Sequence, residues 1–199
     1  MSEMVDIYDE ALRPAGQLDR EEAHRTGALH QVVHCWMIGR REDQPVLYMQ
    51  QRAADKETFP LQYDIAVGGH LRAGETPLEG LARETWEELG ISLDPERLRY
   101  VGAVRQRVPV AGTQDRELAQ VYLYDAGPGG FTPGEEVARV VWVNLHDYRE
   151  LAQGLREQVE VTEDRSPRWE DTEKEMWRDH SREFLEMVLP QLEEMEETL

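Results

Sequence analysis

The 199-residue sequence has little cysteine, little positive charge and no long apolar run. Its single cysteine, Cys35, cannot form an internal disulfide, which favours a reducing compartment. No apolar run approaches the roughly 20 residues that a membrane-spanning helix needs. The first residues, MSEMVDIYDEALR, have neither the basic start nor the apolar stretch of a secretory signal. We therefore expect a cytoplasmic protein without a membrane partner.

The scarcity of positive charge excludes a second class of function. Lysine and arginine number 22 against 41 aspartates and glutamates, so the net charge is −19. The excess is concentrated in residues 150–199, where 16 acidic residues stand against 6 basic ones. Such a surface repels a nucleic-acid backbone, and no basic stripe offsets it. We expect no nucleic-acid partner, and a phosphorylated small molecule would need cations gathered locally.

The residues that are present suffice for one folded domain with a short appendage, since 40% are hydrophobic and 32% charged. Clusters of β-branched and aromatic residues predict strands. A turn is expected at residues 13–16 and a short helix at 21–24. The expected strands cover residues 4–10, 29–39, 46–52, 63–69, 98–108, 117–126 and 138–145.

The clearest helix prediction covers residues 77–89. Thr76 and Glu79 form a capping box, Pro77 occupies the first helical position, and Gly90 supplies the stop. Apolar or small residues recur at the spacing of one buried face, namely Leu78, Leu81, Ala82, Thr85 and Leu89. A helix between strands implies an α/β or α+β layer structure.

Beyond residue 145 the sequence predicts a helix at 146–158, a polar connector at 160–171 and a second helix opened by a capping box at Thr172. The second helix carries a stripe of large side chains at three- and four-residue steps, namely Trp177, His180, Phe184 and Met187. This stripe must pack on its own chain or form a homodimer interface, and the sequence leaves both open. We expect a main domain at 1–160 and an acidic helical extension at 161–199.

The helix at 77–89 carries a cluster of carboxylates. Glu84, Glu87 and Glu88 stand at i, i+3 and i+4, so they share one side of the helix. Like charges at this spacing repel one another unless a cation offsets them. The paired glycines Gly68-Gly69 allow backbone carbonyls to approach a metal closely. Oxygen ligands of this kind favour Mg²⁺ or Mn²⁺, which suits hydrolysis of a phosphoanhydride.

These residues resemble the Nudix box, G-x5-E-x7-R-E-U-x-E-E-x-G-U. Gly69, Glu75 and the run Arg83-Glu84-Thr85-Trp86-Glu87-Glu88-Leu89-Gly90-Ile91 match it at every polar and glycine position. The one departure is Thr85, where the family prefers an aliphatic residue. The box covers 23 residues, and the flanking strands extend the likeness to about residues 5–150. The resemblance implies a Nudix-type α/β/α sandwich with a mixed β-sheet and, in this chain, a C-terminal helical extension.

The resemblance also implies roles for individual residues. Glu87 and Glu88 would be metal ligands, and Glu84 a further ligand or the base that activates water. Gly68 would offer its carbonyl to the metal. Arg83 would orient the glutamates, and Glu75 would support the loop.

Residues outside the box are similar to the isopentenyl-diphosphate isomerase-like branch of the superfamily. They are Asp6–Asp9, Glu22-Ala23-His24, Leu29-His30, Gln51-Arg52, Lys56 and Gly69-His70. Type I isomerases carry a cysteine just before the histidine, and this chain has Gly68 there. Cys35 lies on an expected core strand, so the isomerase thiol is missing. Glu117 matches the second catalytic carboxylate of that branch, and Asp115 a metal-binding one.

The histidines and two cations complete the candidate site. His24, His30 and His70 match isomerase metal ligands, although structural hydrogen-bonding roles are the commoner fate of histidines. Arg52 and Lys56, four residues apart, are candidates for binding a diphosphate, and ordinary surface charge is the alternative. We also expect His70 to face the substrate.

The sequence thus predicts a divalent-metal-dependent Nudix hydrolase that cleaves a diphosphate linkage in a nucleoside diphosphate derivative or a related small organic diphosphate. Two alternatives remain. One is isomerisation of an isoprenoid diphosphate, which the missing thiol opposes. The other is a ligand-binding Nudix module without catalysis, which the complete set of box glutamates opposes.

Overall fold

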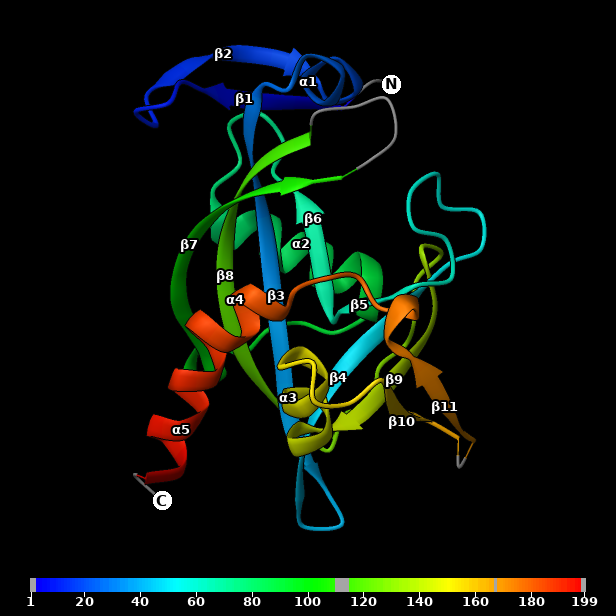
Figure 1. Cartoon of the computed structure of the whole chain (residues 1–199). Helices are drawn as coiled ribbons and strands as arrows, with labels where there is room; N and C mark the ends of the chain where they lie inside the picture. Colours follow the sequence, from blue (N-terminus) through cyan, green and yellow to red (C-terminus); the bar gives the residue numbers. More distant parts are fainter. Residues whose placement is uncertain (1–2, 110–114, 167, 198–199) are drawn as a thin grey trace.

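The computed structural model describes residues 3–109, 115–166 and 168–197, which are built around one large β-sheet (Figure 1). Within these residues the sheet has eleven strands, several of them short. In chain order they are β1 (Met4–Tyr8), β2 (Pro14–Asp19), β3 (Leu29–Arg41), β4 (Gln44–Arg52), β5 (Tyr63–Ile65), β6 (Val67–His70), β7 (Leu98–Val108), β8 (Asp115–Gly127), β9 (Val137–Asn144), β10 (Gln158–Glu163) and β11 (Trp169–Glu173).

Strand β3 is the centre of the sheet and makes it a mixed one. It runs parallel to β8, with His30 opposite Glu117, and antiparallel to β4, β6 and β1. Eight of its first ten residues are buried or nearly so, as expected of a strand covered on both faces. The mixed sheet that the sequence predicted is confirmed.

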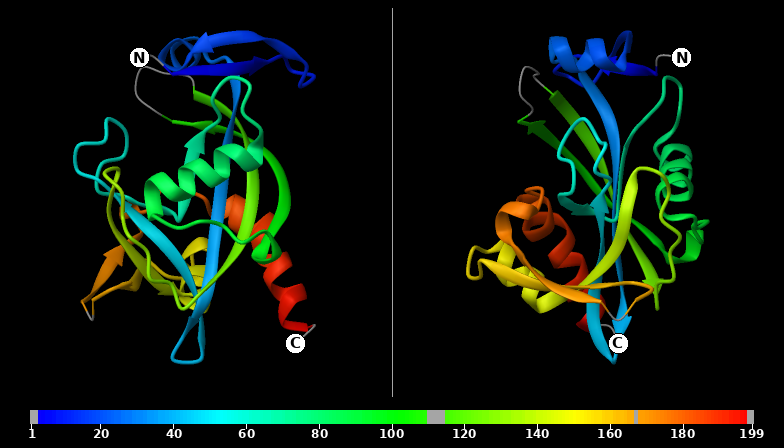
Figure 2. Two further views of the ribbon diagram at one scale, coloured as in Figure 1. Left: turned by 180° about the vertical axis from the view of Figure 1, so that it is seen from behind. Right: turned by 90° about the vertical axis from the view of Figure 1, so that its right-hand side faces the viewer.

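Helices cover both faces of this sheet (Figure 2). Helix α2 (Pro77–Leu89) lies on one face, while α3 (Leu145–Ala152) and the C-terminal helical segment lie on the other. That segment consists of α4 (Ser181–Glu183), a π-helical turn (Phe184–Val188) and α5 (Leu189–Glu197). A short helix, α1 (Arg20–Thr26), joins β2 to β3. The expected α/β/α sandwich is therefore observed. No helix within the described residues is long and apolar enough to cross a membrane.

Helix α2 forms at the predicted residues, but the side chains that it buries are not all those predicted from the apolar pattern. The capping box of Thr76 and Glu79 is present, and Gly90 ends the helix in the left-handed region at φ 65°. Leu78 is exposed, whereas Glu88 is buried together with Leu81, Thr85 and Leu89. The buried face thus includes one of the box carboxylates, which the apolar pattern alone did not indicate.

Two local predictions are wrong, and both concern strands that sequence patterns hid. Residues 14–16 belong to β2, which pairs with β1, and do not form a free turn. The expected polar connector at 160–171 contains the strand pair β10–β11. Val159 and Val161 alternate with polar residues, and this period of two identifies a strand with one buried face. The expected domain boundary at residue 160 falls inside β10.

The predicted helix start at Thr172 is also wrong. Thr172 lies in β11, where its Oγ1 donates to the Val159 carbonyl and accepts from Trp177 Nε1 at 3.0 Å. The helical stretch begins at Ser181 instead. Of the predicted stripe, Trp177, His180 and Phe184 are buried within the chain itself, whereas Met187 is half-buried. Val188, Leu189 and Leu192 of the helical segment are buried as well.

Candidate active site

The paired glycines of β6 and the carboxylate face of α2 meet at one edge of the sheet and line a cavity of about 1110 Å³. The chain brings almost all the predicted site residues to this cavity. Its lining includes Gly68, Gly69, His70, Arg52, Lys56, Arg83, Glu84, Glu87, Glu88 and Glu117. Since these residues come from strands, a helix and a loop, tertiary packing and not sequence proximity assembles the site.

Gly69 allows Glu84 to lie against the backbone of β6. A Cβ atom at position 69 would overlap the Glu84 carboxyl group. Position 68 differs, because a Cβ there would make only ordinary contacts, the nearest at 3.6 Å from Ile65. Burial raises the pKa of Glu84, although the charge and the hydrogen bond of Arg83 act in the opposite direction. Gly69, and not Gly68, is therefore the glycine that leaves room for the Glu84 carboxylate.

Glu88 lies deepest in the carboxylate cluster. Its Oε2 accepts hydrogen bonds from the Gly68 backbone N–H and from Gln50 Nε2, both at 3.2 Å. Burial and the neighbouring charge of Glu84 raise the pKa of Glu88 well above its ordinary value. A buried carboxylate in this situation is stabilised in its charged form by a cation. Glu87, by contrast, is about half exposed.

Arg83 holds the cluster together. Its guanidinium pairs with Glu75, Glu84 and Glu87 at 2.8, 2.7 and 3.2 Å and donates to the His70 carbonyl at 2.9 Å. These hydrogen bonds, led by that of Glu75, raise the pKa of Arg83. Arg83 thus contacts three box glutamates, and Glu75 also accepts from the Arg72 backbone N–H in the loop before α2, while the orienting and supporting roles stay predictions.

A second set of ligand-type side chains lies at the same cavity, where His24, His70, Asp115 and Glu117 line the wall and His30 is fully buried beside them. The nitrogens of His24, His30 and His70 lie within 4.8 Å of one another, and His30 makes a similar group with Asp115 and Glu117. The Nε2 atoms of His24 and His70 are 3.0 Å apart, and His30 Nε2 lies 3.6 Å from Asp115 Oδ1. The chain therefore collects three imidazoles and two carboxylates from four elements.

This second set fits a divalent metal ion. His30 Nε2 and Asp115 Oδ1 are buried, and neither has a hydrogen-bond partner within the described residues. Burial lowers the pKa of His24 to about 4 and, with the charge of Glu117, raises the pKa of Asp115 to about 7. Neutral imidazoles and closely spaced carboxylates are the donors that transition metals prefer. Gly68, Glu84, Glu87 and Glu88 supply the oxygen donors expected for Mg²⁺.

Arg52 and Lys56 line the cavity, and both side chains already contact other groups of the chain. Arg52 is buried and donates to the Thr58 carbonyl at 3.1 Å, and its Nη1 lies 3.5 Å from Asp64. Lys56 pairs with Glu136 at 2.5 Å. Both are therefore held in place at the cavity wall, which reduces the entropy cost of binding an anion.

Sequence reasoning missed a buried ionic cluster at the floor of the cavity. Asp64 pairs with Arg178 at 2.7 Å and with His180 Nε2 at 2.8 Å. Although burial alone would raise it, Arg178 and His180 hold the pKa of Asp64 below its ordinary value. The sequence offered one sign of this cluster: Asp64 stands within the apolar run YDIAV, and a charged side chain buried there requires partners. The partners lie 114 and 116 residues away, so no local pattern could name them.

The sandwich, the capped helix and the carboxylate cavity define a Nudix domain, and the model of the NUDIX domain family matches residues 28–164. The chain belongs to the Nudix family. It is 39% identical over 158 residues to an uncharacterized Nudix hydrolase of Streptomyces coelicolor, which covers 79% of this chain and 70% of that protein. It is 35% identical over 122 residues to an uncharacterized Nudix hydrolase of Clostridium acetobutylicum, covering 61% of this chain and 59% of that protein.

Isomerases are found among the relatives as well. The chain is 31% identical over 148 residues to an isopentenyl-diphosphate Delta-isomerase of Corynebacterium diphtheriae, covering 71% of this chain and 78% of that one. The resemblance to the isomerase-like branch is thus confirmed. Among solved structures, a Deinococcus radiodurans protein superposes with a TM-score of 0.56 at 24% identity, covering 77% of this chain and 89% of that chain. That likeness shows the fold.

The structure places Cys35 away from the cavity. Its side chain is fully buried in the core beside α2, and burial raises the pKa of the thiol. The expectation that Cys35 is a core residue is confirmed. A buried thiol with a raised pKa is a poor proton donor and acceptor at neutral pH.

Proposed function

We propose that this chain is a divalent-metal-dependent Nudix pyrophosphohydrolase, which cleaves the diphosphate linkage of a nucleoside diphosphate derivative or a related small organic diphosphate. The observation that carries the proposal is that the buried carboxylate of Glu88 and the largely buried carboxylate of Glu84 converge with Gly68-Gly69 of β6 on a cavity that also holds Arg52 and Lys56. We propose that it acts in the cytoplasm on a small-molecule substrate.

The residues that line the cavity divide into metal ligands, phosphate-binding groups and candidate bases. Gly68, Glu84, Glu87 and Glu88 would hold Mg²⁺ or Mn²⁺, which supplies charge neutralisation on the diphosphate and lowers the pKa of the attacking water. Arg52 and Lys56, with His70 beside them, would bind the phosphate oxygens. Two carboxylates are candidates for the general base. Burial raises the pKa of Glu84, which favours proton uptake by this carboxylate, and Glu117 lines the same cavity.

Isomerisation is the second candidate, because an isomerase is among the relatives and the histidine–carboxylate set matches that branch. Gly68 argues against it. A thiol is required at this position to move a proton, and Cys35 is buried elsewhere. Incubation with isopentenyl diphosphate decides between the two. Double-bond migration would overturn the hydrolase proposal.

The central experiment is a hydrolysis screen with Mg²⁺ or Mn²⁺ over nucleoside diphosphate derivatives, dinucleotides, coenzyme A species and isoprenoid diphosphates. Glu87→Gln and Glu88→Gln preserve side-chain shape but remove a charged ligand, so we expect both to abolish metal-dependent turnover while circular dichroism stays unchanged. Glu96→Gln, an exposed substitution just beyond α2, serves as the control. Full activity in both ligand variants would refute the assignment.

A further inference from the structure

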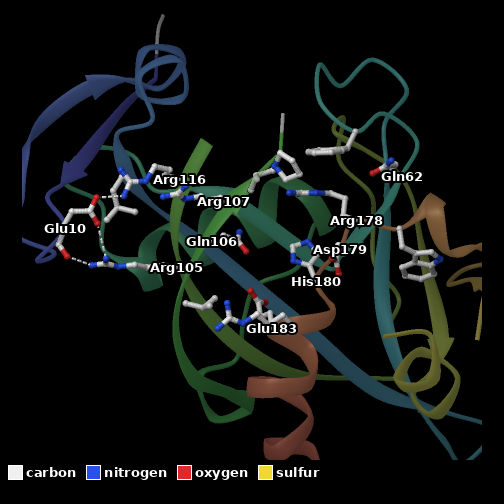
Figure 3. Close-up of a pocket in the computed structure, with 17 residues that line it drawn as sticks. Glu10, Gln62, Arg105, Gln106, Arg107, Arg116, Arg178, Asp179, His180 and Glu183 are labelled. Carbon is white, nitrogen blue, oxygen red and sulfur yellow. Dashed lines mark hydrogen bonds and ion pairs between the residues drawn. The ribbon is translucent and has the colours of Figure 1, made fainter. Parts of the chain in front are cut away.

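Figure 3 shows the residues that line a second cavity, which has a volume of about 720 Å³. It adjoins the carboxylate cavity, because the two share lining residues. Its lining holds five arginines against three acidic residues. This balance is the reverse of the whole chain, whose net charge is −19, and of the carboxylate cavity, whose lining holds thirteen acidic residues against six basic ones. The five arginines are Arg105, Arg107, Arg116, Arg178 and Arg182.

The three acidic residues of this arginine-lined cavity are already engaged. Glu183 binds His34 Nδ1 at 2.7 Å and Trp36 Nε1 at 2.6 Å. Asp179 Oδ1 accepts from the backbone N–H of Ser181 at 3.1 Å. Glu10 pairs with Arg105 and Arg116, and two further arginines pair with acids outside the lining of this cavity, Arg178 with Asp64 and Arg182 with Glu186.

Two of these arginines pair with Glu10, as Figure 3 shows. Arg116 pairs with its carboxylate at 2.5 Å, and Arg105 does so at 3.4 Å while donating to its backbone carbonyl at 2.6 Å. Arg107 is two residues from Arg105 on β7 and opposite Arg116 on β8. The hydrogen bond from Arg116, followed by the charges of Arg105 and Arg107, lowers the pKa of Glu10. Across residues 3–109, 115–166 and 168–197, Arg107 forms no ion pair with any acidic side chain.

The two cavities meet at Arg178, which lines both together with Phe59 and Val108. Arg178 Nη1 binds Asp64, and its guanidinium lies 4.7 Å from the centre of the Phe59 ring. Because the two cavities share these lining residues, a ligand bound in the carboxylate cavity can extend past Arg178 and Phe59 towards Arg107. Arg178 also lies beyond residue 164, where the match to the Nudix domain ends. The C-terminal segment thus adds a wall that the matched domain does not contain.

We propose that the arginine-lined cavity binds a further anionic group, a phosphate monoester or a carboxylate, on the organic half of the diphosphate substrate, with Arg107 as its principal contact. The inference rests on the proposed function, because it takes the substrate to be a diphosphate held in the neighbouring cavity. Guanidinium groups are suited to such oxyanions through paired hydrogen bonds. An isopentenyl chain carries no anion, and it would leave these arginines unused.

The kinetic test uses three substrate pairs that differ in one anionic group. They are coenzyme A and its 3′-dephospho form, NADPH and NADH, and UDP-glucuronic acid and UDP-glucose. We expect the wild type to show a kcat/KM about tenfold higher for the more anionic member of at least one pair, the usual scale for a charge-assisted contact. Arg107→Gln should reduce that preference to within about twofold, through KM, and leave turnover of the less anionic member unchanged.

The matched control is Arg99→Gln. Arg99 is also an exposed arginine of β7, but it lies outside the lining of either cavity, so its loss changes the net charge equally. We expect this variant to keep the wild-type preference. Equal kcat/KM within all three pairs, or a preference that survives in Arg107→Gln, would overturn the inference while leaving the hydrolase proposal intact.

A binding measurement decides the matter if no substrate is hydrolysed, in which case the proposed function fails. Calorimetry with Mg²⁺ compares adenosine 3′,5′-bisphosphate with 5′-AMP. About tenfold tighter binding of the bisphosphate, lost in Arg107→Gln and kept in Arg99→Gln, would support the arginine site. Equal affinities would overturn it. If inorganic phosphate alone binds in an Arg107-dependent manner without any difference between the nucleotides, the site is for a free anion and the substrate assignment is wrong.

Discussion

The two glycines that precede His70 have different physical functions, although the sequence presents them as a simple pair. Gly69 is required because Glu84 occupies the space of a Cβ, whereas position 68 has room for one. Gly68 is instead important for what it lacks, since a relative of the isomerase type would carry its thiol there. Gly69 therefore shapes the carboxylate face of α2, and Gly68 bears on the proposed type of reaction.

Replacing each glycine by alanine separates these functions. Gly69→Ala should displace Glu84 and reduce kcat/KM by about a hundredfold, the scale for misplacing a catalytic group by about 1 Å. Gly68→Ala should fold and retain most activity, because its Cβ would meet Ile65 only at ordinary contact distance. Steady-state kinetics and magnesium titration provide the measurement. An equal loss in both variants would show that the steric account of Gly69 is wrong.

At the scale of elements, the β10–β11 hairpin connects the sheet to the C-terminal segment. Thr172 is the junction, because its hydroxyl joins the Val159 carbonyl to the Trp177 indole in a buried position. Trp177 stacks on Tyr63, which immediately precedes Asp64. The hairpin thus helps to place Arg178 and His180 against the cavity floor.

Thr172→Val should therefore lower the free energy of unfolding. The change keeps the shape but leaves a buried donor and a buried acceptor unsatisfied, at a cost of about 1–3 kcal/mol. Urea denaturation followed by tryptophan fluorescence gives the measurement. Thr162→Val, the same substitution on β10 at a half-buried position, should cost clearly less. Similar losses in the two variants would contradict the assigned role of the Thr172 hydroxyl.

At the scale of the whole molecule, one buried ion pair joins the central strand to the C-terminal helical segment. Glu183 binds His34 and Trp36, residues 149 and 147 positions earlier in the chain. Although burial opposes it, the charge of His34 lowers the pKa of Glu183 to about 2. The same pair raises the pKa of His34 against the effect of burial. The ion pair therefore holds α4, which contributes Glu183 to the lining of the second cavity, against β3.

Glu183→Gln should destabilise the protein by about 3 kcal/mol at pH 7, because His34 loses its buried partner. The folded-state pKa of Glu183 lies below its ordinary 4.5, so its stabilisation is complete above about pH 5 and disappears as the pH falls towards 2. The difference between wild type and variant should shrink over that range in thermal melts. Glu186→Gln, an exposed change on the same segment, should alter stability little at any pH. A difference that does not depend on pH would argue against the ion pair.

The sequence by itself determined the elements whose causes are local. Clusters of β-branched and aromatic residues predicted the strands from β3 to β9, although β5 and β6 were expected as one strand at 63–69. The capping box and Gly90 predicted α2, and the spacing of Glu84, Glu87 and Glu88 placed three carboxylates on one side of it. Local signals also misled. The alternation of Val159 and Val161 was obscured by surrounding charges, and Thr172 carried a capping pattern but lies in a strand.

Tertiary structure alone decided which distant residues share the cavities. Burial of Glu88 and Asp64 depends on packing of α2 and the C-terminal segment against the sheet, and a buried charge then selects partners that sequence distance cannot reveal. The gathering of His24, His30, His70 and Asp115, and the pairing of Arg105 and Arg116 with Glu10, have the same origin. Short-range periodicity encodes elements, whereas the charge environment of a cavity arises only when those elements pack.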